Sequence, residues 1–229
     1  MPRSLEAMVE QQALRWGLVR EQRPEDERRP VITVSRQHGA GGGEVVRRLA
    51  EELRLDVFDR EIIRQIAEST HLSERVVSTL DEQSRAWLSD WLEGLASRDF
   101  LSSAEYRYQL ARVVGAIAHH GGAIVVGHGA HLVLGEGQAL RVRLIAPLEA
   151  RIAAVMKREG LGEREARRRV QAVEAGRRAF VMQHFHVDLE DHSRFDLVLN
   201  TARLGVEGGV AVVRSAVEQC FAALAASGL

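Results

Sequence analysis

The chain has 229 residues and a formal net charge of −1, with 45% hydrophobic and 28% charged residues. This length is sufficient for one α/β domain with a hydrophobic core, and the balanced charge argues against a general nucleic-acid binder. No apolar run reaches the length of a membrane span, and the first residues lack the apolar stretch of a secretory signal. The single cysteine, Cys220, excludes an internal disulfide, so we expect a cytoplasmic protein that does not bind membranes.

Residues 1–30 differ from the rest of the chain. Met8, Val9 and Trp16 lie near one face at helical spacing, and a charged linker that contains prolines follows them. We expect a docking helix that packs on its own domain or on a second subunit, and in the second case the protein would be a homodimer. Residues 31–229 are expected to form the main domain.

From residue 31 onward, short apolar segments alternate with segments of helical periodicity. The apolar segments are rich in Val, Ile and Leu and predict buried strands at 31–35, 55–58, 123–127, 140–146 and 196–200. Helices are predicted at 43–53, 147–159 and 163–185, and a long helical stretch at 60–120. Strands separated by helices need crossover connections, which produce a parallel sheet covered on both faces.

Two local signals mark helix ends within the long helical stretch. Ser102 with Glu105 forms a capping-box signature, which predicts a helix start. The Gly121-Gly122 pair predicts the end of that helix before the third strand.

A glycine-rich segment, residues 35–43, joins the first predicted strand to the next helix; we call it the glycine loop. Ligands of open α/β sheets bind at the carboxyl ends of the strands, where helix N-termini present free N–H groups to anions. Four glycines within five residues allow backbone amides to approach an anion closely. The loop therefore indicates phosphate binding, and the alternative is a flexible turn between strand and helix.

Two familiar nucleotide-binding patterns do not match the glycine loop. The pattern GxxxxGK[ST] requires Lys at Gly42 and Ser or Thr at Gly43. The pattern GxGxxG matches Gly39 and Gly41, but its third glycine falls on Glu44. Pattern matching alone therefore leaves the kind of phosphate ligand open.

Four stretches in a fixed order carry a resemblance to a known family. They read SRQHGAGGGE at 35–44, FDREII at 58–63, VVGHGA at 125–130 and SRFDLVLNTARLG at 193–205. Over about residues 31–215 the chain resembles the cytidylate kinase-like branch of the nucleoside monophosphate kinases. The resemblance implies a three-layer αβα P-loop kinase fold with a five-stranded parallel sheet in the order 2-3-1-4-5. It also implies a helical insert at about 60–120 and a lid at about 160–185.

The same resemblance implies the ligands and the residues that bind them. ATP with Mg²⁺ would lie over the glycine loop, and the acceptor would be a nucleoside monophosphate, with CMP the expected one. Ordinary cytidylate kinases carry Gly-Arg-Asp after the third strand, where this chain has Gly127-His128-Gly129. His128 is therefore a candidate for acceptor binding. The residues expected to bind ATP are Ser35, Gly39, Ala40, Gly41, Gly42, Gly43 and Glu44.

Basic side chains are the candidates for catalysis, because phosphoryl transfer depends mainly on positioning and charge neutralisation. Arg177 and Arg178 lie where the resemblance places lid arginines; the alternative is that they form a solvated helix face. Arg151 opens the helix after the fourth strand and resembles an arginine that contacts the nucleotide. No resident metal site is expected, because the paired histidines lack a recognised ligand spacing.

Arg36 is the candidate replacement for the missing loop lysine. The only lysine in the chain, Lys157, lies in the helix after the fourth strand, so the replacement must be an arginine. Arg36 is nearest in sequence, and its planar guanidinium suits two phosphate oxygens. The alternative is that Arg36 pairs with a carboxylate such as Glu44 and only braces the loop.

Further candidates for acceptor binding follow the second strand. Asp59 could contact the acceptor or a water on Mg²⁺, or it could simply cap the next helix. Arg60 and Arg64 could meet the acceptor phosphate. The aromatic residues of the insert (Trp87, Trp91, Tyr106 and Tyr108) could line a base pocket, form a dimer contact, or pack the insert.

The expected activity is transfer of the ATP γ-phosphate to a monophosphate. Two alternatives remain open. The absent lysine and His128 favour a regulatory nucleotide-binding module that kept the fold and lost turnover. A dinucleotide-binding protein is the weaker alternative, because GxGxxG does not match.

Overall fold

The computed structural model describes residues 29–96, 105–134 and 137–227, together with residues 7, 9–12, 14 and 16 near the N-terminus. The capping-box residue Ser102 lies outside these residues. No helix within the described ranges is both long enough and apolar enough to span a membrane.

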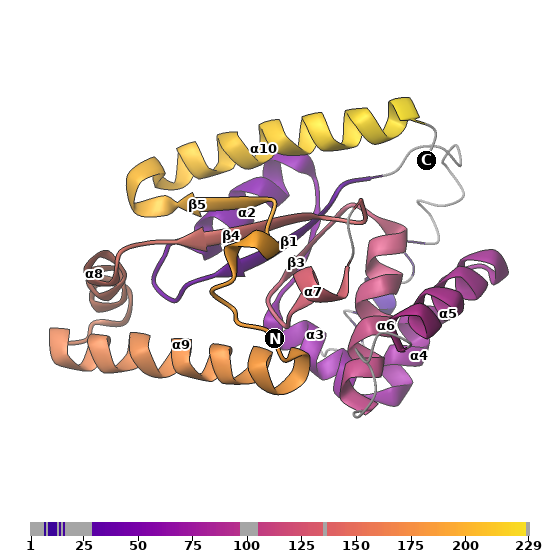
Figure 1. Ribbon diagram of the computed structural model, residues 1–229, viewed down its shortest axis with the longest axis horizontal. Helices are drawn as coiled ribbons and strands as arrows, with labels where there is room; N and C mark the ends of the chain where they lie inside the picture. The colour runs from indigo at the N-terminus through magenta and orange to yellow at the C-terminus, as the bar shows by residue number, and fades with distance from the viewer. Residues whose placement is uncertain are drawn as a thin grey trace.

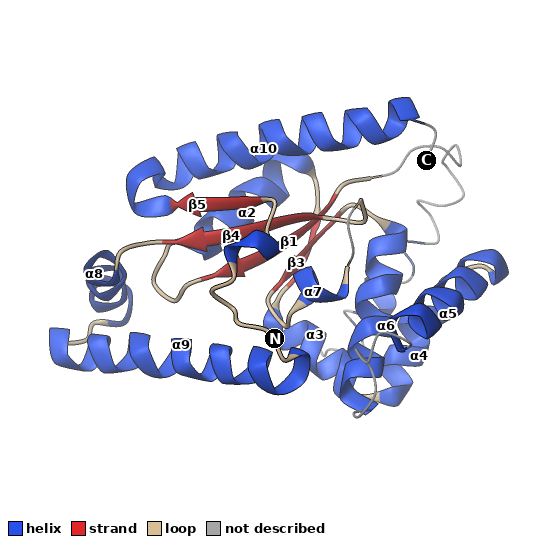
Figure 2. Cartoon of the chain, in the orientation of Figure 1, coloured by secondary structure: helices blue, strands red, loops and turns tan. Residues whose placement is uncertain are grey.

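Five parallel strands form one sheet (Figure 2). They are β1 (Val31–Arg36), β2 (Asp56–Phe58), β3 (Ala123–Val126), β4 (Leu140–Ile145) and β5 (Leu197–Asn200). Their order is β2-β3-β1-β4-β5, which confirms the predicted topology. The observed strand ends differ from the predicted ones by one residue. β3, for example, ends before Gly127, whose φ of 82° takes the chain out of extended backbone.

Helices connect the strands. They are α2 (Gly42–Leu53), α3 (Arg60–Glu68), α4 (Thr70–Ser78), α5 (Glu82–Ala96), α6 (Glu105–His120), α7 (Ala130–Val133), α8 (Leu148–Glu159), α9 (Glu163–Phe185), the 3₁₀ helix η1 (His192–Arg194) and α10 (Thr201–Ser227). In its described residues, the stretch predicted at 60–120 is divided into four helices. One division lies at Ser69, whose backbone is extended and whose hydroxyl caps α4 by accepting the Leu72 N–H at 3.3 Å. As predicted, α6 ends directly before Gly121-Gly122.

The helices cover both faces of the sheet (Figure 1). α2 and α10 pack on one face, against Ile32 and Val34 of β1. α3, α6 and the end of α9 pack on the other face, against Val31 and Val125. Neighbouring residues of β1 are therefore buried on opposite faces, which explains why the strands read as continuous apolar runs rather than alternating ones.

The described residues near the N-terminus are helical and lie against this second face. Val9 and Trp16 are buried. The Trp16 ring stacks on His120 with a centroid distance of 4.3 Å and on Phe58 at 5.9 Å. These contacts place the N-terminal helix on the end of α6 and on β2.

Candidate active site

The glycine loop follows β1 at the carboxyl end of the sheet. Gly39 and Gly41 have φ values of 85° and 69°, in the left-handed region of backbone conformation that residues with a Cβ rarely adopt. A Cβ on Gly39 would also lie 2.5 Å from the carbonyl oxygen of Arg151, so this position requires glycine. α2 then begins at Gly42. The first N–H groups of α2 therefore carry positive partial charge at the loop, which is how helix N-termini bind anions.

Side chains from other segments hold the glycine loop in place. The Thr201 hydroxyl at the start of α10 donates to the Ala40 carbonyl at 2.6 Å. The Gln37 side-chain oxygen accepts the Ala146 N–H at 3.1 Å. The Arg151 Nε donates to the Ala146 carbonyl at 2.9 Å, and its buried Nη1 has no hydrogen-bond partner among the described residues. The predicted candidate Arg151 thus lies under the loop with one donor unsatisfied.

Arg36 lies along the start of α2. A Cβ added to Gly42 would be 3.0 Å from both Cβ and Cδ of Arg36, and one added to Gly43 would be 3.8 Å from its Nη1. In the pattern GxxxxGK, Arg36 occupies the position of the first glycine and Gly42 that of the lysine. The arginine therefore fills the space beside the residue that would otherwise be the lysine.

The Arg36 guanidinium forms no ion pair with a carboxylate in the described part of the chain. Glu44, the partner that the brace alternative requires, instead binds Arg47 on the exposed face of α2. Asp59 caps α3 and accepts two backbone N–H bonds there, at 2.9 and 3.0 Å. Burial lowers the pKa of Arg36, and the charge of Asp59 offsets part of this effect. A partly buried cation beside a helix N-terminus is an environment that favours an anion.

α9 contacts the glycine loop through two charged residues. The buried Glu174 carboxylate accepts the backbone N–H of His38 at 2.7 Å. Arg177 Nη1 donates to the Arg36 carbonyl at 2.5 Å and to Glu174 Oε1 at 3.2 Å. Figure 1 shows α8 and α9 on the side of the molecule where the β1 and β4 arrows end. The long basic helix is thus fixed to the loop by specific hydrogen bonds.

His38 lies within a group of charges at this contact. Its Nε2 is 3.3 Å from Arg158 Nη2 and 3.7 Å from Glu159 Oε1. Burial lowers the pKa of His38, the nearby Arg158 and Arg177 lower it further, and the two glutamates oppose them. His38 is therefore held toward its neutral form next to the loop backbone.

A pocket opens between the ends of β1 and β3, under α9; we call it the β1–β3 pocket. It is lined by Ser35 and Arg36 of β1, by the turn 126–129 after β3, by His131 of α7, and by Arg177 and Phe180 of α9. His128 is buried in this turn, and its Nδ1 lies 2.8 Å from the Tyr106 hydroxyl of α6. The lining is therefore cationic at Arg36 and Arg177 and aromatic at His128 and Phe180.

Beneath the β1–β3 pocket lies a buried arginine that the sequence interpretation missed. Arg143 of β4 is opposite Ser35 in the sheet register and donates to its Oγ at 2.8 Å. It also pairs with Glu190 at 2.8 Å and lies over the Phe195 ring. The two arginines of β4, Arg141 and Arg143, stand among apolar residues of a predicted buried strand, and this was the signal available in the sequence. Glu174 was missed as well, since one glutamate in a charged helix carries no such signal.

The predicted catalytic and acceptor residues do not all meet at this site. Arg36 and Arg177 do, whereas Arg178 is exposed on α9. Arg64 pairs with glutamates on the exposed face of α3 at 2.6 Å. The side chain of Arg60 lies outside the part that the structure describes. The roles predicted for these three residues stay predictions.

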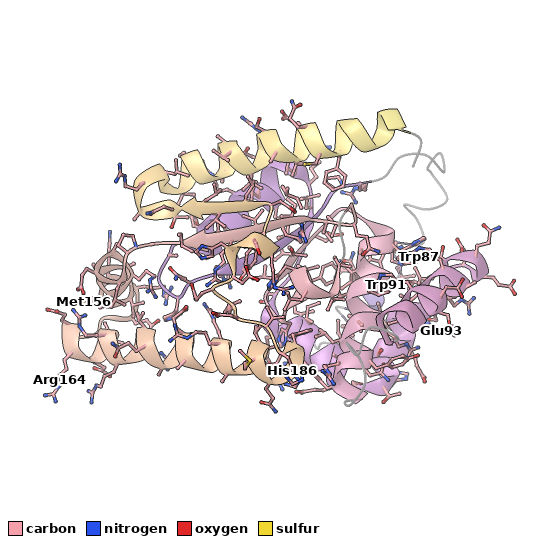
Figure 3. All side chains as sticks on the ribbon, viewed as in Figure 1. Trp87, Trp91, Glu93, Met156, Arg164 and His186 are labelled. Carbon is pink, nitrogen blue, oxygen red and sulfur yellow. The ribbon has the colours of Figure 1, made fainter. Side chains whose placement is uncertain are left out.

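Most aromatic residues of the insert lie away from the pocket. Trp87 and Trp91 stack at 5.9 Å on α5 (Figure 3). Trp91 packs on α6 where Gly115 leaves room, since a Cβ there would be 2.6 Å from its ring. Tyr108 is exposed. Only Tyr106 reaches the β1–β3 pocket, through His128.

The strand order, the glycine loop after β1 and the arginine-bearing helix over that loop define an α/β protein of the P-loop kinase class. The chain belongs to the cytidylate kinase-like family, whose sequence model matches residues 31–203.

Several curated relatives and solved structures are similar to the chain. It is 29% identical over 192 residues to the cytidylate kinase of Methanopyrus kandleri, covering 82% of this chain and 93% of the relative. The cytidylate kinase of Pyrococcus horikoshii is 26% identical over 193 residues, with 82% and 88% covered. The crystal structure of an uncharacterized protein from Eubacterium ventriosum superposes with a TM-score of 0.58 at 14% identity, covering 83% of this chain and 99% of that one. That structural likeness shows the fold alone.

Proposed function

We propose that this protein is a nucleotide kinase that transfers the γ-phosphate of ATP to a nucleoside monophosphate, with CMP the expected acceptor. Family membership and the relatives named cytidylate kinase support this proposal. The observation that carries it is the convergence of Arg36 and Arg177 on the glycine loop. Two guanidiniums beside a helix N-terminus form a site for a polyphosphate.

ATP would be held by the glycine loop and its supports. The N–H groups at the start of α2 would bind phosphate oxygens, with Arg36 in the place of a loop lysine. The unsatisfied Nη1 of Arg151 fits a hydrogen-bond acceptor on the nucleotide. Gly43 provides no hydroxyl for a metal, and the described residues hold no group of three or more His, Cys, Asp or Glu side chains able to bind one. Mg²⁺ would therefore enter with ATP and supply neutralisation of phosphate charge.

The acceptor monophosphate would occupy the β1–β3 pocket. Its phosphate would lie at the cationic part of the lining, near Arg36 and Arg177, and its base near Phe180 and His128. In-line transfer then needs no covalent intermediate, because the chain's main task is to position both phosphates and to neutralise charge. Arg177, which now binds the loop backbone, would turn to the transferring phosphate.

A release assay for ADP, run with each nucleoside monophosphate in turn, tests the proposal. We expect turnover with one or a few monophosphates, CMP among them, and only background hydrolysis without an acceptor. Absence of ADP release with every monophosphate would contradict the proposed activity.

The second candidate function is a nucleotide-binding regulatory protein without turnover. It is favoured by the Glu174 carboxylate on the loop and by the absence of the lysine and hydroxyl of GxxxxGK[ST]. Calorimetric binding of ATP together with no ADP release would select this candidate.

A further inference from the structure

Arg143 is a charged residue buried in β4, next to the central strand β1. Its side chain is 1% exposed, and its Nε has no hydrogen-bond partner among the described residues. Its one carboxylate partner there, Glu190, is 35% exposed. Burying a guanidinium is costly even when it is paired, and an apolar residue of similar volume would fill such a position more favourably. The position therefore suggests a role beyond packing.

The hydrogen bond between Arg143 and Ser35 fixes the direction of the serine hydroxyl. A guanidinium can only donate, so Ser35 Oγ accepts from Arg143 Nη1 at 2.8 Å. Among the described residues Ser35 Oγ makes no other hydrogen bond. Its O–H proton is thus left for a further acceptor, and Ser35 lines the β1–β3 pocket.

The charges around the pocket favour an anion as this acceptor. Arg36 and Arg177 line the pocket, and Arg143 lies beside Ser35 on the neighbouring strand β4. His131, which also lines it, is buried and neutral, so it contributes no charge. The carboxylates nearby are already engaged, Glu174 with Arg177 and the loop backbone, and Glu190 with Arg143.

We infer that Ser35 donates its hydroxyl hydrogen bond to the phosphate of the acceptor, and that Arg143 is the positioning residue that aims this hydroxyl into the β1–β3 pocket. The inference rests on the proposed function, because it assigns the acceptor phosphate of that reaction to this pocket. Ser35, which the sequence alone led us to expect at ATP, would thus contact the acceptor instead. The ATP triphosphate would lie on the glycines of the loop and on the start of α2, where neither Ser35 nor Arg143 would hold it.

Kinetics of three variants test the inference: Ser35→Ala, Arg143→Met and Arg143→Lys. We expect Ser35→Ala and Arg143→Met each to raise the KM for the monophosphate about tenfold, while the KM for ATP stays within about twofold. Arg143→Lys, which keeps a donor, should recover most of the loss. Because both residues act through one hydroxyl, the double variant Ser35→Ala/Arg143→Met should be no worse than either single variant.

Arg141→Met is the matched control, since Arg141 lies on the same strand and pairs with Asp196 outside the pocket. It should leave the KM for the monophosphate unchanged. If Arg143→Met does not fold, Ser35→Ala still tests the inference, because it removes only the hydroxyl. An unchanged KM for the monophosphate in Ser35→Ala, equal effects on both substrates, or additive effects in the double variant would overturn it.

Calorimetric titration of CMP separates this inference from the proposed function. A wild-type protein that binds CMP without turnover contradicts the proposed function, and the same variants then report through the CMP dissociation constant. A wild-type protein that turns over normally, with CMP affinity unaffected by Ser35→Ala, contradicts the inference alone. Absence of binding of every monophosphate would overturn both.

Discussion

Glu174 of α9 accepts a hydrogen bond from the backbone N–H of His38 in the glycine loop, at 2.7 Å. The same carboxylate oxygen is 3.2 Å from Arg177 Nη1, which donates to the Arg36 carbonyl. A buried carboxylate thus occupies a loop amide at the site where we propose that phosphate binds. Nucleotide binding would then require this negative charge to move away or to be tolerated close by.

Replacing Glu174 with Gln should therefore tighten ATP binding. The amide of Gln can still accept the His38 N–H, but it no longer repels a phosphate. We expect the dissociation constant for ATP to fall at least about threefold, equivalent to roughly 0.7 kcal/mol. Isothermal titration calorimetry measures this, with Glu165→Gln, an exposed glutamate of the same helix, as the control. Weaker ATP binding in Glu174→Gln would mean that the carboxylate supports the nucleotide site.

Arg36→Ala should weaken ATP binding at least about tenfold, which corresponds to roughly 1.4 kcal/mol. The guanidinium lies beside Gly43 at the start of α2, without a carboxylate bound to it in the described part of the chain. The melting temperature of the protein without ligand should change little. Arg47→Ala, which removes an exposed arginine of α2, is the control. Unchanged ATP affinity would exclude Arg36 from the site, and a large loss of stability would favour a bracing role.

Variants at positions 36 and 42 test whether Arg36 takes the place of the lysine that the pattern GxxxxGK would put at position 42. Gly42→Lys alone should weaken ATP binding, because its Cβ would lie 3.0 Å from two carbons of Arg36. The double variant Arg36→Gly/Gly42→Lys restores the pattern GxxxxGK and removes that crowding. We expect it to bind ATP at least about threefold more tightly than Gly42→Lys, a gain of roughly 0.7 kcal/mol. Equal ATP affinity of the single and the double variant would show that removing the Arg36 side chain does not compensate for a lysine at position 42.

Arg177→Ala should lower kcat roughly 100-fold, because it removes a charged donor from the transferring phosphate. Arg177 is the arginine of α9 that lines the β1–β3 pocket. Arg164→Ala is the control, since Arg164 is exposed at the start of α9 and points away from the domain (Figure 3). Steady-state kinetics with saturating ATP measure both variants. A similarly small decrease in kcat in both variants would show that Arg177 takes no part in catalysis.

The buried His131 should make the folded protein less stable as the pH falls. Burial, followed by the charge of Arg143, lowers the pKa of His131 from 6.5 to about 3. Below about pH 6.5 the unfolded chain takes up a proton that the native protein does not, so the free energy of unfolding decreases with falling pH.

Between pH 7 and pH 5 the decrease in the free energy of unfolding should be about 2 kcal/mol larger in wild type than in His131→Asn. Urea unfolding at the two pH values measures it, and the exposed His71→Gln should behave like wild type. An identical pH dependence in wild type and His131→Asn would show that His131 takes up its proton equally in both states.

Much of the fold could be predicted from the sequence. The five apolar runs gave the strands to within one residue at each end, because both faces of a parallel sheet are buried and the runs are uninterrupted. The glycines at 39 and 41 marked a loop with left-handed backbone, which few other residues adopt. Within the long helical stretch, the helix start after Ser69 was not predicted, although its hydroxyl caps α4.

The site was predicted only in part. Arg36 could be identified because it adjoins the glycine loop in sequence, and local chain geometry keeps it there. Both Arg177 and Arg178 were predicted; which of them lies at the loop depends on the face of α9 that contacts it, and Arg177 is the one that contacts the Arg36 carbonyl. The hydrogen bonds of Glu174 to His38 and of Arg143 to Ser35 join residues 136 and 108 positions apart. Such pairings depend on how strands and helices pack, and a single sequence carries no local signal for them.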